Sequence, residues 1–104
     1  MASMVVIYRT PKDPAAFDAH YYGVHIPLAK RLPGLLRYEV SQRPILMPAG
    51  DPEPYRVAIL QFVDLATMRN AFSTPEGQAC AADRRVLAPD DDDVQMYLFD
   101  TVEV

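Results

Sequence analysis

The chain has 104 residues, of which 50% are hydrophobic, and a formal net charge of −4 at neutral pH. Its basic residues are scattered, which argues against the clustered positive surface that a nucleic acid or an anionic membrane requires. No apolar run approaches the ~20 residues of a membrane span, and the N-terminal apolar run, residues 4–8, is too short for a secretion signal, so a cytoplasmic protein is expected.

The first part of the chain predicts a strand followed by an interrupted helix. Residues 4–9 are rich in β-branched side chains, which is typical of a strand. A helix is expected over residues 14–32, because Asp13 can cap its start. Pro27 interrupts this helix, since it has no N–H to give to the preceding turn and its ring crowds that turn. The sequence therefore predicts a kink or stop near Gly23 and a second, short helix that begins at Pro27.

Three more strands and two more helices are predicted in the rest of the chain. A loop at residues 47–54 separates two of the strands, because it contains three prolines and a glycine. The order β-α-β-β-α-β predicts a ferredoxin-like α+β fold, in which an antiparallel sheet has helices on one face, as a single domain over residues 1–104. The further elements are strands at 35–45, 55–63 and 94–104, and helices that begin at Asp64 and at Ser73 or Thr74.

Both faces of the predicted sheet are largely apolar. The third strand places Ala58, Leu60 and Phe62 on one face and Val57 and Ile59 on the other, and the last strand is similarly apolar on both sides. Helices cover only one face in this topology, so the other face is left as an exposed apolar surface. The pattern predicts a homodimer in which sheet packs on sheet around a two-fold axis.

Two further features have structural explanations. The aspartates at residues 90–93 predict a solvated loop, because they lack the alternating spacing of a calcium loop; a cation site is the alternative. Cys80, the single cysteine, lies among alanines in a predicted helix and is expected to be a small buried residue rather than a nucleophile. Two histidines and one cysteine are a poor supply of ligands for a metal site.

One stretch of the sequence resembles the signature of the EthD family. Phe17, Tyr21 and Tyr22 match its aromatic first helix, and the signature itself lies in residues 25–30 (HIPLAK), 32–35 (LPGL) and 37–40 (RYEV). The family belongs to the dimeric α+β-barrel superfamily, so the resemblance implies a homodimer of ferredoxin-like subunits. It is named for a protein encoded with an ether-degrading oxygenase system. Related barrels include muconolactone isomerases, cofactor-free polyketide monooxygenases and fungal enzymes that dehydrate or decarboxylate aromatic polyketides.

His25 and Tyr38 are the expected catalytic residues. His25 lies at the helix interruption, and the ordinary pKa of histidine suits a general acid or base. The methylmuconolactone methylisomerases are similar over this stretch, with a histidine before the Pro-Gly-Leu turn and a tyrosine at the start of the next strand, which implies that His25 and Tyr38 bind or activate a ligand. That group also uses cysteines, and residues 57–67 contain none, so the same nucleophilic route is not expected.

Tyr22, Tyr8 and Arg9 are weaker candidates for substrate binding. Tyr22 precedes His25 by about one helical turn. Only one of Tyr8 and Arg9 can point to the helix side of the first strand. In the alternative interpretation, His25 donates to a backbone carbonyl freed at the kink and only holds the helix. His20 is expected at the surface and on a different helix face from His25.

These features predict a cofactor-free enzyme of isomerase, dehydratase or lyase type that acts on a small oxygenated aromatic, lactone or polyketide-like molecule. His25 would be its acid/base and Tyr38 its hydrogen-bond donor. The alternatives are a non-catalytic dimeric accessory protein that binds or hands over a hydrophobic metabolite, and a structural dimer with a closed core. No cofactor, metal, nucleic acid or membrane partner is expected, although haem held through one histidine, as in some barrels of the superfamily, stays open.

Overall fold

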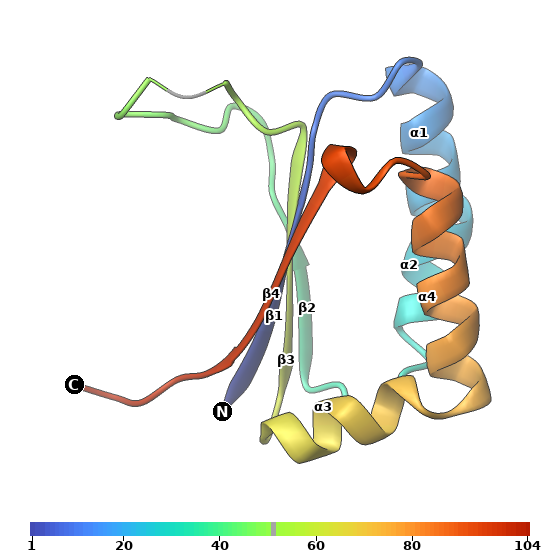
Figure 1. Ribbon diagram of the computed structural model, residues 1–104, viewed down its shortest axis with the longest axis vertical. Helices are drawn as coiled ribbons and strands as arrows, with labels where there is room; N and C mark the ends of the chain where they lie inside the picture. Colours follow the sequence, from blue (N-terminus) through green and yellow to red (C-terminus); the bar gives the residue numbers. More distant parts are fainter. Residues whose placement is uncertain (51) are drawn as a thin grey trace.

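The computed structural model describes residues 1–50 and 52–104 and shows a four-stranded sheet with helices against one of its faces (Figure 1). The strands are β1 (Ala2–Tyr8), β2 (Arg37–Val40), β3 (Arg56–Phe62) and β4 (Val94–Asp100). They lie in the order β2-β3-β1-β4, and every neighbouring pair is antiparallel. The topology confirms the predicted ferredoxin-like α+β fold.

Two long helical segments run along the sheet, and a shorter helix crosses one end of it (Figure 1). The first segment joins α1 (Pro14–His20), the π-helical turn η1 (Tyr21–His25) and α2 (Ile26–Ala29); the second is α4 (Pro75–Leu87), and the crossing helix is α3 (Leu65–Phe72). The predicted N-caps are present, since Asp13, Asp64 and Thr74 each accept from a backbone N–H in the first turn. No helix among the described residues has both the length and the apolar character needed to cross a membrane.

The predicted break in the first helix is replaced by the π-turn η1. The backbone N–H of Ile26 donates to the carbonyl of Tyr21, five residues back, and the chain keeps right-handed helical dihedral angles on both sides of this turn. Pro27 has no N–H with which to continue the α-helical pattern. A π-turn accommodates this loss without ending the helix. The helical path therefore continues from Pro14 to Ala29.

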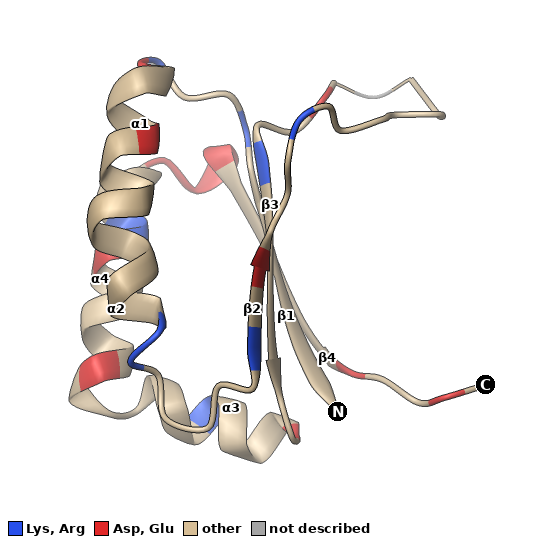
Figure 2. Ribbon diagram, turned by 180° about the vertical axis from the view of Figure 1, so that it is seen from behind, with Lys and Arg blue, Asp and Glu red and all other residues tan. Residues whose placement is uncertain are grey.

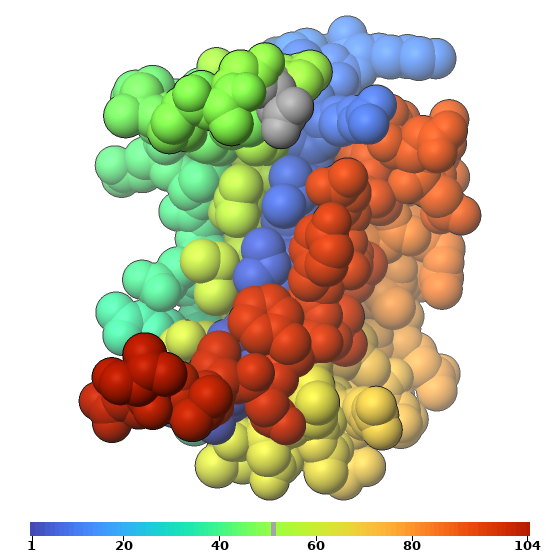
Figure 3. Space-filling view, turned by 60° about the vertical axis from the view of Figure 1, so that its left-hand side comes forward, coloured from blue at the N-terminus to red at the C-terminus, as the bar shows by residue number. Residues whose placement is uncertain are grey.

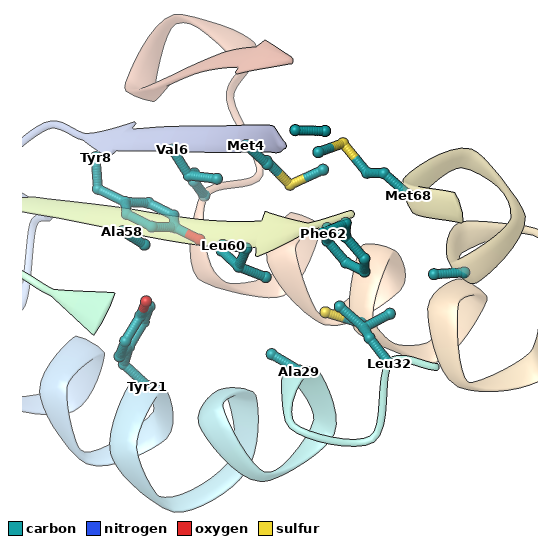
Figure 4. Packing of buried hydrophobic residues seen from close by; sticks show 14 of the residues in the cluster. Met4, Val6, Tyr8, Tyr21, Ala29, Leu32, Ala58, Leu60, Phe62 and Met68 are labelled. Atoms are coloured by element: carbon teal, nitrogen blue, oxygen red, sulfur yellow. The ribbon is translucent and has the colours of Figure 1, made fainter. Parts of the chain in front are cut away.

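Alternate residues of the two central strands point toward the helices and form the core (Figure 4). We call this side of the sheet the inner face. The register pairs Met4 with Leu60 and Val6 with Ala58, so these side chains pack beside each other. The core contains Met4, Val6, Tyr8, Ala58, Leu60 and Phe62 from the strands and Phe17, Tyr21, Ala29, Leu32 and Met68 from the helical side.

The opposite side of the sheet, which we call the outer face, carries no helix (Figure 1; Figure 3 shows its surface with β4 in red beside β1 in blue). The register places Ile59, Val5 and Tyr97 in one row across three strands. Tyr97 is 51% exposed and Phe99 is 42% exposed. The face is therefore apolar and open to solvent within this subunit, as the strand pattern predicted. Its apolar residues are Val5, Ile7, Val57, Ile59, Tyr97 and Phe99.

Two strands end earlier than predicted because their partners do. β2 ends at Val40, which pairs with Ala58 close to the start of β3. β4 ends at Asp100, which pairs with Ala2, the first residue of β1. A strand needs a neighbour to satisfy its backbone groups, so apolar composition alone cannot extend it.

The two predicted loops, at residues 47–54 and 90–93, are not described to the same extent. The loop at residues 47–54 contains Asp51, which lies outside the described residues. The acidic loop forms a short 3₁₀ turn, η2 (Asp91–Asp93), and Asp90 caps it by accepting from the N–H of Asp92. All four aspartates are exposed, as expected for a solvated loop.

Candidate functional site

A cavity of about 420 Å³ lies between the inner face of the sheet and the helices. This volume suits a small organic molecule. Most of the wall is apolar, and a few polar groups enter it from both layers. The wall includes Met4, Val6 and Leu60 from the sheet, Ala29, Cys80 and Ala81 from the helices, and the polar side chains of Tyr8, Tyr21, His25 and Tyr38.

His25 and His20 both form hydrogen bonds with the carboxylate of Asp83 in α4. The Nδ1–H of His25 donates to Asp83 Oδ2 over 2.9 Å, and the Nε2–H of His20 donates to Asp83 Oδ1 over 2.8 Å. The π-turn makes this possible, because its hydrogen bonds join residues five apart and bring side chains five apart onto one face. The prediction that His20 and His25 lie on different faces was wrong, because it assumed α-helical spacing.

The environment of His25 favours the uncharged form of its ring. Its side chain is only 8% exposed. Burial lowers the pKa of His25 below its ordinary 6.5, and the hydrogen bond and charge of Asp83 act in the opposite direction. At neutral pH the ring is therefore uncharged. With Nδ1–H directed at Asp83, the free lone pair is on Nε2. These contacts do not match the alternative in which His25 donates to a freed backbone carbonyl.

Three tyrosine hydroxyls share the cavity wall with His25. Those of Tyr21, from η1, and Tyr38, from β2, hydrogen-bond to each other over 2.7 Å. Whichever of the two accepts keeps its own O–H free to donate to a ligand. Burial raises the pKa of Tyr38 to about 12 and also raises the pKa of Tyr8 and Tyr21, so all three are protonated at neutral pH. The Tyr8 hydroxyl has no hydrogen-bond partner within residues 1–50 and 52–104, although its side chain is buried.

Arg56 holds the tyrosine side of the site in place. Its guanidinium carbon lies 4.5 Å from the centroid of the Tyr21 ring and 4.8 Å from that of Tyr22. Its Nη2–H donates to Asp18 Oδ1 over 3.0 Å, which fixes the guanidinium beneath the rings. The side chain of Tyr21 points from η1 toward the strands (Figure 4).

The structure brings His25, Tyr38 and Tyr8 together on the cavity wall, but not the other two predicted site residues. Tyr22 follows Tyr21 on the helix, so it points away from the cavity and is 52% exposed. Arg9 follows Tyr8 in the chain, is exposed, and lines a second cavity between α1 and the segment after α4. The expectation that Tyr22 and Arg9 contact a ligand in the His25 cavity is therefore corrected.

Asp83 is the site residue that sequence reasoning missed. It lies three positions after Cys80 in α4, and both residues are on the buried face of that helix. A carboxylate on a buried helix face requires a partner, because an unpaired buried charge is costly. The position of Asp83 on the helix was therefore a usable signal that the residue has a buried partner, but it did not identify the two histidines.

Cys80 also lines the cavity but is not a nucleophile at neutral pH. It is buried, and this burial raises the pKa of its thiol to about 11. The residue therefore packs as a small apolar side chain, as expected. No group of three or more His, Cys, Asp or Glu among the described residues is arranged to hold a metal ion.

Comparison with known sequences identifies related proteins. The family model described as the EthD domain matches residues 9–91. An 11.0 kDa protein from the thcB-thcC intergenic region of Rhodococcus erythropolis is 39% identical over 83 residues, which are 80% of this chain and 80% of the relative.

Solved structures share the fold over nearly the whole chain. An EthD family protein from Bacillus halodurans is 27% identical with a TM-score of 0.86, covering 98% of this chain and 99% of that one. SnoaB from Streptomyces nogalater, described as a cofactor-independent oxygenase, is 20% identical with a TM-score of 0.67, covering 99% of this chain and 94% of that one. At this level of identity, the second similarity shows the fold alone.

Proposed function

Because the chain belongs to the EthD family, we propose that it is a cofactor-free enzyme that moves a proton on a small oxygenated organic molecule. An aromatic ketone, a lactone or a polyketide-like compound would fit the cavity and its polar groups. His25 is the proposed acid/base and Tyr38 the proposed hydrogen-bond donor. Support for catalysis without a cofactor comes from SnoaB, a protein of the same fold that is described as a cofactor-independent oxygenase.

One observation carries this proposal: His25 is buried on the cavity wall and its Nδ1 is bound to Asp83 at 2.9 Å. The carboxylate selects the tautomer and orients the ring, as a carboxylate does for the histidine of a catalytic triad. The lowered pKa of His25 keeps Nε2 unprotonated at neutral pH. A side chain that only stabilised the helix would not need to face a cavity wall.

The chemistry follows from these groups. The Nε2 lone pair accepts a proton from a carbon next to a substrate carbonyl, and the electron pair of the broken C–H bond moves to the carbonyl oxygen as an enolate. The O–H groups of Tyr38 and Tyr8 can donate to that oxygen, and Asp83 stabilises the imidazolium that forms. Return of the proton to a different carbon gives an isomer, and loss of a β-hydroxyl with that proton gives a dehydrated product.

A deuterium-exchange experiment tests the proposal with 2-tetralone, whose C1–H lies between a carbonyl and an aromatic ring. Its exchange in D₂O is followed by proton NMR with and without the protein. The wild type is expected to accelerate exchange, and His25→Gln to lower that rate by about 100-fold or more. Tyr22→Phe, which changes a ring outside the cavity, is the matched control and should retain the rate. Retained exchange in His25→Gln would remove His25 from the mechanism.

A binding or hand-over role is the second candidate, and the apolar wall favours it. Apart from the histidine, the tyrosines, one serine and three arginines, the wall consists of apolar side chains such as Met4, Leu60 and Cys80, which hold an apolar ligand without acting on it. In this case 2-tetralone would bind to the protein with no gain in the exchange rate, and His25→Gln would change its affinity only modestly.

We further propose that two copies assemble through the outer face. Tyr97, Phe99 and the row formed by Val5 and Ile59 leave an apolar surface uncovered in one subunit. A second copy of the same face is self-complementary around a two-fold axis. The cavity lies on the opposite side of the sheet, so this assembly would leave its wall within one subunit. Light scattering over a dilution series measures the assembly, and a monomer at all concentrations would contradict it.

A further inference from the structure

We propose that the ligand of the His25 cavity is an organic acid, whose apolar body occupies the cavity while its carboxylate binds at a rim lined by Arg69, Arg84 and Arg85. The inference rests on the proposed function in one respect, namely that the cavity binds a small molecule. It goes further by specifying the charge of that molecule and the end of the cavity where the charge lies.

The charge of the cavity wall is one-sided. Three arginines line it, Arg69 from α3 and Arg84 and Arg85 from α4 (Figure 2 shows basic positions in blue on both helices). No aspartate or glutamate lines it within residues 1–50 and 52–104, although the chain has 14 acidic residues and a net charge of −4. Asp83 lies nearby, but both of its oxygens accept from histidines. An anion entering this cavity therefore meets three positive charges on the wall and one nearby negative charge, that of Asp83, so the balance favours attraction.

The second cavity is an internal comparison. It has a similar volume, about 420 Å³, and its wall also carries basic residues, Arg9 and Lys12. There, however, three aspartates line the same wall, so charges of both signs are present and the negative ones are in excess. The absence of carboxylates from the first cavity is thus not a general property of cavities in this chain.

The arginines are available to a ligand. None of the three has a carboxylate within 4.0 Å among the described residues, whereas Arg37, Arg43 and Arg56 each do. Arg84 gives one N–H to the carbonyl of Ala88 at 3.2 Å and keeps its other donors. Arg69 and Arg85 are exposed. Guanidinium groups are well suited to carboxylates because their planar N–H donors match the two oxygens.

The rest of the wall sets the direction in which such a ligand would lie. Arg69 and Arg85 are exposed, and Met96 and Leu98 of β4, which line the same cavity, are 42% and 46% exposed, so part of the wall opens to solvent. His25 and Tyr21, which also line the cavity, are buried. A ligand held by its carboxylate at the open side would thus extend its apolar part and reacting oxygen toward His25.

A favourable interaction with the helix dipole does not account for the pattern by itself. Arg69 is in the last turn of α3, and Arg84 and Arg85 are in the last turn of α4, where basic residues are generally favoured. That preference explains the residue type at those positions. It does not explain why the wall facing them lacks carboxylates.

A pair of probes that differ only in charge tests the inference. Binding of 2-naphthoate and of its neutral analogue 2-naphthamide is measured by titration calorimetry at pH 7.5. The wild type is expected to bind the naphthoate at least about tenfold more tightly. Added salt should weaken naphthoate binding and leave naphthamide binding unchanged, because only the first involves a charge pair.

Substitutions then locate the site. The double variant Arg69→Gln with Arg85→Gln changes two exposed side chains and should remove most of the preference for naphthoate. Arg84→Gln should also reduce this preference, whereas Arg84→Lys, which keeps the positive charge, should retain part of it. Arg31→Gln, an exposed arginine away from the cavity, is the matched control and should keep the preference. Ala81→Trp fills the cavity and should block both probes, whereas its exposed neighbour Ala82→Trp should block neither.

The outcomes separate this inference from the proposed function. Equal affinity for the two probes, with Ala81→Trp blocking both, would overturn the organic-acid inference and leave a cavity that binds neutral molecules. Naphthoate binding that persists in Ala81→Trp would place the anion elsewhere and also overturn the inference. Binding of neither probe by the wild type would overturn both the inference and the proposal that the cavity holds a small aromatic ligand.

Discussion

The two faces of the sheet are built by the same strands but differ in what they contact. Residues at even positions of β1 and β3, such as Leu60 and Tyr8, face the helices and border the cavity. Residues at odd positions, such as Ile59 and Val5, form the outer face, which no helix covers. The inner face therefore carries both the core and the polar groups of the site. The outer face carries mainly apolar side chains, with polar ones such as Gln61 among them.

This difference shows that the apolar residues of the strands have two separate roles: some line the core and the cavity, and others form the uncovered outer face. On the inner face, apolar residues leave space for a ligand because the helices stand off around a cavity and polar groups enter at a few points. On the outer face, the same residue types have no partner in the subunit. Substitutions on adjacent positions of one strand should therefore affect different properties, which the following predictions use.

The largest effect on subunit stability is expected from Phe62→Ala on the inner face. Phe62 is fully buried in the core, so its truncation should cost about 3–5 kcal/mol of unfolding free energy. Gln61→Ala, one residue earlier and on the outer face, is the control and should cost less than about 1 kcal/mol. Denaturant unfolding at one fixed protein concentration measures both values. Similar losses for the two variants would contradict the division between the faces.

Tyr97→Glu should weaken the proposed dimer with little effect on the fold of the subunit. Tyr97 is half exposed in one subunit, so the change is tolerated there, whereas in a paired outer face it would bury an uncompensated charge. Such a charge costs about 3–5 kcal/mol, which corresponds to a loss of dimer affinity of 100-fold or more.

Light scattering against concentration measures this change. Ala82→Glu adds the same charge on the exposed side of α4 and should leave the dimer intact. A dimer that survives Tyr97→Glu would show that the outer face is not the interface.

Two tyrosines of the inner face should differ when each loses its hydroxyl. Tyr38→Phe leaves the Tyr21 hydroxyl buried without its partner, which should cost about 1–3 kcal/mol of unfolding free energy. Tyr8→Phe removes a hydroxyl that has no protein partner within the described residues, so stability should change by less than about 0.5 kcal/mol. Thermal unfolding of the two variants measures the difference. A larger loss for Tyr8→Phe than for Tyr38→Phe would contradict the hydrogen-bond assignment.

The smallest expected effect is a dependence of stability on pH that comes from His25. The pKa of His25 is lowered in the folded state by burial, so near pH 6 the unfolded chain binds more protons at this residue. Its contribution to stability is complete above pH 6.5 and declines as the pH falls from 6.5 toward the folded pKa. Unfolding measured between pH 8 and pH 5 should show this decline, and His25→Gln should remove it.

The neighbours of His25 allow the sign of this effect to be checked. Asp83 raises the pKa of His25 and His20 lowers it. An NMR titration of the His25 ring should therefore give a lower pKa in Asp83→Asn and a higher one in His20→Gln. Shifts in the opposite directions would show that the three side chains are not arranged as described.

Much of the site followed from local sequence features. The helix interruption was placed correctly at residues 21–27, because the missing N–H of Pro27 is a local property of the chain. The choice of His25 and Tyr38 as candidates followed from the family resemblance and their neighbouring motifs, and both residues line the cavity. The form of the interruption did not follow, because a kink, a stop and a π-turn all accommodate a proline and the local sequence does not distinguish among them.

Distant contacts account for what sequence reasoning missed. Asp83 is 58 residues from His25 along the chain, and no local pattern joins them. Tyr22 was a weak candidate because it precedes His25 by about one helical turn, and Arg9 because it lies on the first strand beside Tyr8. In the structure neither residue lines the cavity. The direction in which a side chain points depends on the twist of its helix or strand, and the spacing of residues in the sequence predicts that direction only approximately.

The sequence by itself determined the order of the elements, the two apolar faces of the sheet and the caps of the helices, because these depend on residues close together in the chain. Tertiary structure decided which residues share the cavity, how long β2 and β4 extend, and which histidine nitrogen is free. Each of these depends on the packing of segments that are distant in sequence. The arginines of the rim belong to the second group, since α3 and α4 bring them to one cavity only when both helices are in place.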